Sequence, residues 1–309
     1  LISLANLSIL RDAPVLETLN LLDNKLTETA PISLPSLVNL DLSFNNLTRL
    51  FIENTPKLRL LNLCINLLTS IDNLPHLPQL EDLYVTGNLL TKIPQLSSAS
   101  NIQTLILTQN RISAIPPSAF ADYTGLEILY LPSNPISSLN PASFEGLNNL
   151  TYLTLSNANL TKLERAPFEH LNNLESLDFS RNPIVDIEED AFEPLHHLKE
   201  LWMIHNNITK IDKRLFAGRL PNLISLDLSN NQLKSFENGT FDKPIESIKL
   251  EGNPIVCDES LDWFVQWLAD QRKSYGDLTI YCSLYFCNRK TTIPLLSSET
   301  VLDDVVCAA

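Results

Sequence analysis

The sequence has few basic residues and no long apolar run, and both absences limit its function. Lysine and arginine total 22 against 36 aspartate and glutamate residues, which gives a net charge of −14. This balance argues against nucleic acid as a partner, because no basic face is available to neutralise phosphates. No run of 18 or more apolar residues is present, so we expect no transmembrane segment in this chain. We interpret the acidity as solubility of a large exposed surface rather than as capture of a basic ligand.

Motifs typical of enzymes are also missing. The sequence contains no HExxH, GxSxG, GxxxxGK[ST] or CxxC motif. One acidic run, Asp186, Glu188, Glu189 and Asp190, has carboxylates that Ca²⁺ could use, but it lacks the ligand spacing of a calcium loop. A solvated charge run is the simpler interpretation. We therefore expect no enzymatic activity, no metal and no cofactor.

What the sequence does contain is one segment repeated along its whole length. In LISLDLSNNQL (223–233), leucine or asparagine occupies positions one, four, six, nine and eleven, which is the leucine-rich repeat signature. Neighbouring copies lie 21 to 25 residues apart, a regularity that chance does not produce. Eleven copies begin at Leu16, Leu37, Leu58, Leu80, Ile102, Leu126, Leu150, Leu174, Leu198, Leu223 and Ile245.

The pattern within a repeat predicts a parallel sheet over a continuous core. Apolar residues at positions four and six give a short strand with one inward face. One copy cannot bury that face alone, so copies must stack in register into a solenoid. The position-nine asparagine amide can satisfy backbone groups that the turn after the strand would leave unpaired. These asparagines are Asn24, Asn45, Asn66, Asn88, Asn110, Asn134, Asn182, Asn206, Asn231 and Asn253, and only Ala158 interrupts them.

Two further features predict the convex side and the end of the stack. In the longer repeats a phenylalanine recurs at position nineteen, which predicts a convex column of Phe120, Phe144, Phe168, Phe192, Phe216 and Phe241. After Ile255, apolar residues spaced i, i+3, i+4 and i+7 (Leu261, Phe264, Val265 and Leu268) predict an amphipathic helix of about four turns. Asp258 is placed to cap it. This helix provides the apolar lid that the last coil needs.

Cysteine usage and glycosylation sequons indicate an oxidising, extracellular setting. Four of the five cysteines crowd the last fifth of the chain and predict a disulfide-pinned cap with three permitted pairings: Cys257, Cys282, Cys287 and Cys307. Six Asn-x-Ser/Thr sequons point the same way: Asn6, Asn46, Asn149, Asn159, Asn207 and Asn238. Because Leu1 opens inside a repeat-like segment, we expect the chain to be a mature or trimmed piece.

Taken together, the chain resembles animal extracellular leucine-rich repeat proteins with a cysteine-rich C-terminal cap. The resemblance covers residues 16–307 and implies a curved α/β solenoid with a parallel sheet on its concave face. We divide the chain into a partial first repeat (1–15), the repeats (16–255) and the cap (256–309). The family's cap usually opens with Cys-x-Cys, but Glu259 stands at the second position and Cys287 appears later. The usual cysteine-rich N-terminal cap is missing, which leaves the first strand edge bare unless upstream residues cover it.

Candidate binding residues are those that replace short polar residues on the outward side of the strands. Asp41, Asp178 and Asp227 at position five, with a serine two residues later, are interpreted as surface residues without special purpose. Exposed aromatic residues in a contiguous patch are typical of protein–protein contacts, and ordinary cross-strand packing or cover by a glycan is the alternative. The candidates are Tyr84, Ile106, Ile128, Tyr130, Tyr152, Trp202, Ile204 and His205.

The leading hypothesis is a secreted or cell-surface module, such as a receptor ectodomain or recognition factor, that holds a protein partner on the concave sheet. The alternative is a non-catalytic subunit of a larger homo- or hetero-oligomeric extracellular complex. Cys64, outside the C-terminal cluster, bears on this choice: it is either an intermolecular or reactive thiol, or a free thiol shielded by Leu60, Ile65 and Leu67. A glycan on Asn207 would crowd Trp202 and move the centre of the patch to Tyr84–Tyr152.

Overall fold

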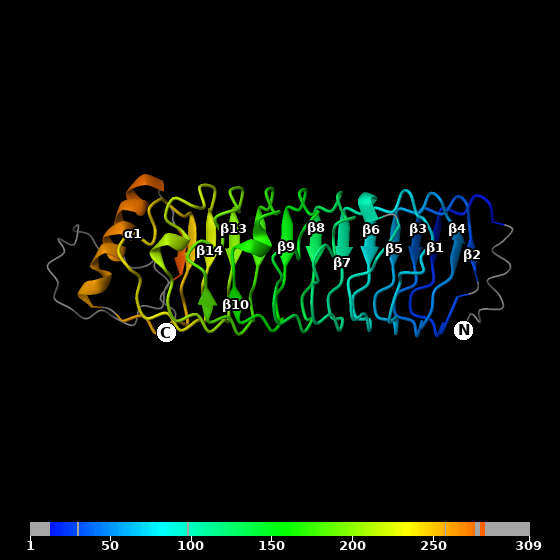
Figure 1. Cartoon of the computed structure of the whole chain (residues 1–309), viewed down its shortest axis with the longest axis horizontal. Helices are drawn as coiled ribbons and strands as arrows, with labels where there is room; N and C mark the ends of the chain where they lie inside the picture. Colours follow the sequence, from blue (N-terminus) through cyan, green and yellow to red (C-terminus); the bar gives the residue numbers. More distant parts are fainter. Residues whose placement is uncertain (1–12, 30, 98, 257, 276–278, 282–309) are drawn as a thin grey trace.

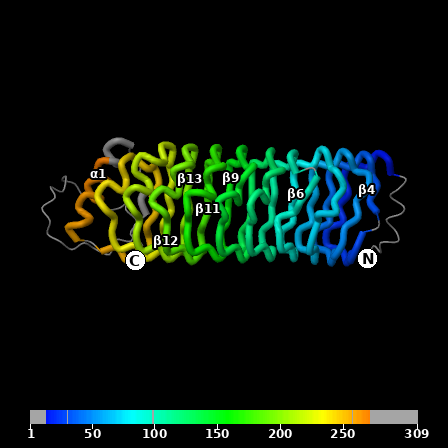
Figure 2. The backbone as a smooth tube through the Cα atoms, in the orientation of Figure 1, coloured from blue at the N-terminus to red at the C-terminus, as the bar shows by residue number. Residues whose placement is uncertain are grey.

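The chain coils repeatedly about one axis and forms a solenoid, which confirms the predicted fold (Figure 1, Figure 2). The computed structural model describes residues 13–29, 31–97, 99–256, 258–275 and 279–281. Each sequence repeat makes one coil, and the coils stack in chain order from the N-terminal end to helix α1 (Asp262–Tyr275) at the other end (Figure 1). The division into a partial first repeat, repeats and cap remains a prediction.

A parallel sheet of twelve strands runs along one side of the solenoid. Eleven strands come one from each repeat, at positions three to five, and keep the same register from coil to coil; Leu40, for example, pairs with Leu19 and Leu61. The twelfth, β16 (Thr279–Tyr281), pairs with the last repeat strand and is not predicted by the repeat pattern. The repeat strands are β1 (Thr18–Asn20), β3 (Asn39–Asp41), β5 (Leu60–Asn62), β6 (Asp82–Tyr84), β7 (Thr104–Ile106), β8 (Ile128–Tyr130), β9 (Tyr152–Thr154), β11 (Ser176–Asp178), β13 (Glu200–Trp202), β14 (Ser225–Asp227) and β15 (Ser247–Lys249).

The remaining elements are short. Two more pairs of parallel strands form outside the main sheet, β2 (Ile32–Ser33) with β4 (Ile52–Asn54) and β10 (Lys162–Leu163) with β12 (Asp186–Ile187). Single 3₁₀ turns occur at η2 (Ala99–Asn101), η3 (Ala166–Phe168), η4 (Lys213–Leu215) and η5 (Glu259–Leu261). Between strands the backbone therefore follows the core without long regular helices.

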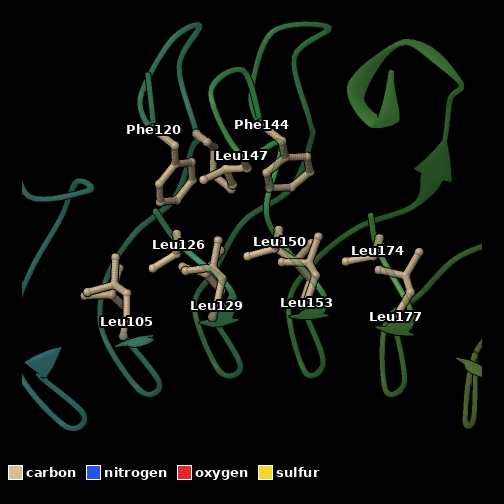
Figure 3. Packing of buried hydrophobic residues seen from close by; sticks show 14 of the residues in the cluster. Leu105, Phe120, Leu126, Leu129, Phe144, Leu147, Leu150, Leu153, Leu174 and Leu177 are labelled. Carbon is tan, nitrogen blue, oxygen red and sulfur yellow. The ribbon is translucent and has the colours of Figure 1, made fainter. Parts of the chain in front are cut away.

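The core is a set of columns, each built from one repeat position. The leucines at positions one and four are stacked next to the strands, and Phe120 and Phe144 lie farther from the strands, on the other side of the core (Figure 3). Both phenylalanine rings are fully buried and stack with centroids 6.4 Å apart, and Phe144 stacks on Phe168 at the same distance. The predicted phenylalanine column is therefore present in the core.

The asparagine at position nine joins each coil to the one before it. Asn110 is typical: its Nδ2 donates to Val85 O of the preceding coil at 2.9 Å and to Leu107 O of its own coil at 3.0 Å. Its Oδ1 accepts from Leu90 N at 3.0 Å. These groups are buried, and a buried backbone group left unpaired costs about as much as a lost hydrogen bond. The amide thus satisfies a backbone group of its own turn, as predicted, and also bonds to the preceding coil, which the sequence interpretation did not predict.

Ala158 shows what happens where the asparagine is missing. Elsewhere in the ladder, the position-eleven N–H of a coil donates to the asparagine of the next coil. Ile136 N, which precedes Ala158 by one coil, donates instead to Asn134 O within its own turn at 2.8 Å. Ile255 N in the last repeat does the same with Asn253 O. The repeat before Ala158 therefore resembles the last repeat of the stack, because one hydrogen bond between coils is replaced by a bond within the turn.

The end of the stack is covered by α1, which packs differently from its predicted apolar stripe. Asp258 Oδ1 accepts from Ser260 N at 2.9 Å and caps η5, which leads into the helix. Leu261 and Phe264 are buried, but Val265 is exposed. The rings of Trp263 and Trp267 pack beside Phe264 instead, and the ring centroids of Phe264 and Phe241 are 5.8 Å apart. The buried face of the helix therefore includes the two large indoles and excludes Val265. Through Phe264, the helix adds one more ring to the end of the phenylalanine column.

Replacing Asn110 by alanine should destabilise the solenoid by roughly 2–4 kcal/mol, because it leaves Leu90 N buried without a partner and removes one of the two amide donors from each of Val85 O and Leu107 O. Thermal and urea unfolding followed by circular dichroism would measure the loss. Asn24→Ala is the matched control, since within the described ranges the half-buried Asn24 amide donates to Leu21 O and Leu22 O of its own turn and to no other coil. An Asn110→Ala effect no larger than that of Asn24→Ala would refute the inter-coil role.

Candidate protein-binding surface

The outward residues of the twelve-stranded sheet form one continuous surface, called here the sheet face. In most repeat strands the middle residue, at position four, is buried while positions three and five are half-buried. Because side chains alternate across a strand, positions three and five share the outward side. The sheet face is therefore two rows of side chains held at fixed spacing by the strands.

Five predicted residues lie on neighbouring strands and make up what we call the aromatic patch. Tyr84, Ile106 and Tyr130 occupy position five of β6, β7 and β8 and are paired in register. Ile128 and Tyr152 occupy position three of β8 and β9 and are also paired. All five are half-buried, so each combines packing against its neighbours with accessible surface. The structure thus brings together the first five candidates.

Two tyrosines form the centre of the aromatic patch. The rings of Tyr130 and Tyr152 stack with centroids 5.0 Å apart and planes inclined by 29°. Burial, together with the neighbouring Tyr130, raises the pKa of Tyr152 to about 12, so this hydroxyl stays protonated at physiological pH. Burial also raises the pKa of Tyr84. The stack presents a pre-ordered aromatic surface whose hydroxyls can form hydrogen bonds.

Trp202, Ile204 and His205 form a second group rather than part of the aromatic patch. Two strands, β9 and β11, lie between Tyr130 and Trp202, and they carry Thr154 and Asp178 at position five. Trp202 and Ile204 are half-buried. His205 is exposed in the turn after β13 with a φ of 53°, at the rim of the sheet face. The sheet face therefore has two aromatic centres about three strand spacings, roughly 15 Å, apart.

The polar residues at position five have a structural role that the sequence interpretation missed. Asp41, Asp178 and Asp227 each accept a hydrogen bond from the backbone N–H of the serine two residues later, at 2.8–3.0 Å. Asn20 and Asn62 accept the equivalent bond in their own repeats. A short acceptor at position five thus satisfies the chain as it leaves the strand. The recurrence of Asp, Asn or Thr there is the signal that could have revealed it.

Bulky residues at position five cannot make this bond, and two repeats compensate in different ways. Tyr130 is followed at position seven by Pro132, which has no N–H to satisfy. After Trp202, Ile204 N donates to Ser180 Oγ of the previous coil at 3.2 Å. In these repeats a large outward side chain replaces the short side chain that would accept the hydrogen bond from the position-seven N–H. The fold does not require a large side chain at position five, which favours a binding role over simple packing.

A group of exposed apolar side chains at one edge of the first repeats was not predicted from the sequence. We call this group the N-terminal rim; its members are 38% to 54% exposed: Leu22, Phe44, Ile65 and Leu67. Phe44 and Ile65 both sit at position eight, where the backbone has positive φ in every repeat. Ile65 Cδ1 lies 2.5 Å from where a Cβ on Gly87 would be, so a side chain at position 87 would displace the end of the Ile65 side chain.

Cys64 lies between the N-terminal rim and the aromatic patch. It is half-buried and is a free thiol in the described part of the chain. Burial raises the pKa of the Cys64 thiol, and hydrogen bonds with Thr86 only partly oppose that rise. Because the thiolate is the reactive form, this environment favours a shielded thiol over a reactive one.

The predicted covalent sites are only partly described. Cys257, Cys282, Cys287 and Cys307 lie outside the described residues, as does Asn6, so the pairing of the cap remains a prediction. Asn149 already has a structural partner, since its Nδ2 donates to Thr124 O at 2.9 Å. The sequon asparagines in the described part of the chain are all exposed: Asn46, Asn149, Asn159, Asn207 and Asn238.

The acidic run is not simply solvated, because basic side chains from neighbouring coils pair with it. Glu188 lies 3.5 Å from Lys162 Nζ, and Asp190 lies 3.6 Å from Arg165. Glu189 pairs with Arg214. These cations neutralise the carboxylates that Ca²⁺ would need. In the described part of the chain, no group of three or more His, Cys, Asp or Glu side chains is arranged to hold a metal ion.

Comparison with known proteins identifies the class. The family described as Leucine rich repeat matches residues 100–160, 149–208 and 198–255, which together cover just over half of the chain. The chain belongs to the leucine-rich repeat family. No curated protein sequence matches it significantly. None of the helices in the described ranges is long and apolar enough to cross a membrane.

One solved structure gives a more specific likeness. The chain is similar to a leucine-rich repeat chain in an octameric complex of Latrophilin 3 (Lec, Olf), Unc5D (Ig, Ig2, TSP1) and FLRT2 (LRR). The TM-score is 0.64 and the sequence identity 26%, over 76% of this chain and 73% of that one. The fold and this likeness support a protein-binding module.

Iodoacetamide should alkylate Cys64 several-fold more slowly in the native protein than in the urea-unfolded protein, because burial keeps the thiol protonated. Peptide mass spectrometry would follow Cys64 separately from the other cysteines. Raising the pH should accelerate the native reaction further than it accelerates the unfolded one, whose thiol ionises at lower pH. Equal native and unfolded rates at pH 8 would show that Cys64 is a reactive thiol.

Proposed function

We propose that this chain is an extracellular protein-binding module that holds a protein partner on its sheet face, centred on the aromatic patch. The observation that carries the proposal is the stacked Tyr130–Tyr152 pair, half-exposed beside Ile106 and Ile128. Tyrosine is enriched among residues that dominate binding energy, and ordered aromatic rings lose little entropy on binding. The strands hold these rings at fixed spacing before any partner arrives.

One comparison supports this setting, and two proposed modifications are consistent with it. FLRT2 (LRR), whose fold is similar, occurs in a complex with Latrophilin 3 and Unc5D, which is a protein-assembly context for that protein. We propose N-glycans on the exposed sequon asparagines, and disulfides within the cap, both of which belong to an extracellular environment. A glycan on Asn207 would flank Trp202 and leave the aromatic patch accessible, because three strand spacings separate them.

Replacing Tyr130 and Tyr152 together by alanine should weaken binding by roughly thirtyfold or more, since truncating a hot-spot residue commonly costs ~2 kcal/mol. The partner would be captured from source fluid or tissue with the wild-type protein, identified, purified and measured by biolayer interferometry. Phe51→Ala is the matched control, because Phe51 is 41% exposed but lies outside the twelve-stranded sheet. Unchanged affinity of the tyrosine variant would place the partner elsewhere.

The N-terminal rim favours a second candidate function, that of a non-catalytic subunit in a larger extracellular assembly. Leu22, Phe44, Ile65 and Leu67 are large apolar side chains exposed on the first three coils. Exposed apolar groups that lie together mark interaction sites more often than isolated ones do. In this function the rim, with Cys64 beside it, makes the essential contact and the aromatic patch is secondary.

The subunit candidate predicts that the purified chain self-associates or joins its complex through the rim. Phe44→Asn combined with Leu67→Gln should then return the chain to monomer mass in light scattering, with no change in unfolding temperature. Val185→Asn, an exposed apolar residue on another surface, is the control. A wild-type chain that is monomeric, and whose complex survives the rim variant, would eliminate this candidate. Loss of the wild-type assembly on reduction alone would instead assign the contact to a cysteine.

A further inference from the structure

The second aromatic centre of the sheet face is surrounded by carboxylates. In the sheet register, Trp202 lies between Asp178 on β11 and Asp227 on β14. Glu200, two residues before Trp202, projects from the same side of β13. A strand spacing of ~4.8 Å places all three carboxylates around one indole ring.

These carboxylates are held in place mainly by neutral donors. Asp178 accepts from Ser180 N at 2.8 Å and from Thr154 Oγ1 at 3.2 Å. Glu200 accepts from Ser176 Oγ at 2.8 Å. Within the described ranges neither residue forms an ion pair, so both retain their full charge toward the solvent side. Asp227 differs, because it is almost fully buried and lies 3.5 Å from Lys249 Nζ.

The same imbalance extends along the whole sheet. The residues of its twelve strands include a single cation, Lys249, which pairs with Asp227. The acidic strand residues are Asp41, Asp82, Asp178, Glu200 and Asp227.

Away from the sheet face, the acidic run at 186–190 is paired with cations. These cations are Lys162, Arg165 and Arg214 from neighbouring coils. On the sheet face, by contrast, Asp178 and Glu200 have no cationic partner in the described part of the chain, and both lie beside the Trp202 ring.

From this charge complementarity we infer that the protein partner presents a basic segment whose arginine or lysine side chain lies over the Trp202 indole between Asp178 and Glu200. The inference rests on the proposed use of the sheet face and names the chemistry of its partner. Tryptophan is the best ring for a cation, and a guanidinium can stack on it while donating to flanking carboxylates. The acidity of this face then has a purpose beyond solubility.

The probe is a fluorescently labelled nona-arginine peptide, with nona-glutamate as the sign control, titrated by fluorescence anisotropy. All proteins are produced in a host that adds no N-glycans, because Asp178→Asn and the control Asp41→Asn would each create an Asn-x-Ser sequon. Asp178→Asn combined with Glu200→Gln should weaken nona-arginine binding by roughly tenfold or more, in line with the loss of charge-assisted contacts at a hot spot. The fold should survive, because Asn62 already accepts the same position-five bond in its own repeat. Trp202→Ala should give a loss of similar size, and Trp202→Phe a smaller one, because phenylalanine keeps a weaker cation-binding ring.

A second double variant, Asp41→Asn with Glu53→Gln, separates a local site from net charge. It removes the same charge, and Asp41 has the same serine partner as Asp178, but β3 lies seven strands from β13. We expect it to change nona-arginine affinity less than twofold. Equal losses in the two double variants, or equally tight binding of nona-glutamate, would overturn the inference and leave only non-specific attraction to an acidic protein.

The purified partner distinguishes failure of this inference from failure of the proposed function. If the partner is lost with Tyr130→Ala/Tyr152→Ala but binds the Asp178→Asn/Glu200→Gln variant normally, the sheet face binds it without a basic contact and the inference is wrong. If neither double variant affects the partner, the proposed function itself is wrong. Loss with both variants, at an affinity that falls as salt rises, supports both.

Discussion

The fold depends on a hydrogen-bonding problem that no single coil can solve. Each turn after a strand leaves buried N–H and C=O groups with which the asparagine of the next coil forms hydrogen bonds, as Asn110 does with Leu90 N and Val85 O. Because the bonds run from coil to coil, each coil is completed by the next, and the stack is stable as a whole. The inward leucines fill the space between these ladders and fix the strand register.

Inward residues form the core and the hydrogen bonds between coils, so outward residues on the strands are less constrained by the fold. Position five shows this difference, because it holds either a short acceptor or a large side chain. A short acceptor such as Asp178 or Asn62 satisfies the following N–H and contributes nothing larger to the surface. Tyr130 and Trp202 cannot do so, and Pro132 and Ser180 compensate around them. Large outward residues therefore carry information about binding that the fold alone does not.

The sequence predicts most of the fold because its information is periodic. Positions one, four, six and nine return in every repeat, so the core, the asparagine ladder and the phenylalanine column follow from spacing. Features that depend on non-repeating partners do not follow. The pairing of β16 with β15 joins a segment outside the repeats. Val265 fits an i, i+3, i+4 pattern, yet the bulk of Trp263 and Trp267 decides which helix face is buried.

The candidate site was predictable in its aromatic residues but not in its charge. Tyr84, Ile106 and Tyr130 depart from a repeating polar position, so a linear pattern reveals them. Ion pairs between coils depend on which side chains meet across 20 or more residues of connector, and no spacing rule predicts that Arg165 reaches Asp190. The net charge of −14 therefore does not say where on the surface the negative charge lies. The local arrangement is more informative, because Asp178 and Glu200 lie beside Trp202 without a cationic partner in the described part of the chain, and a cationic side chain there gains both a ring and a counter-charge.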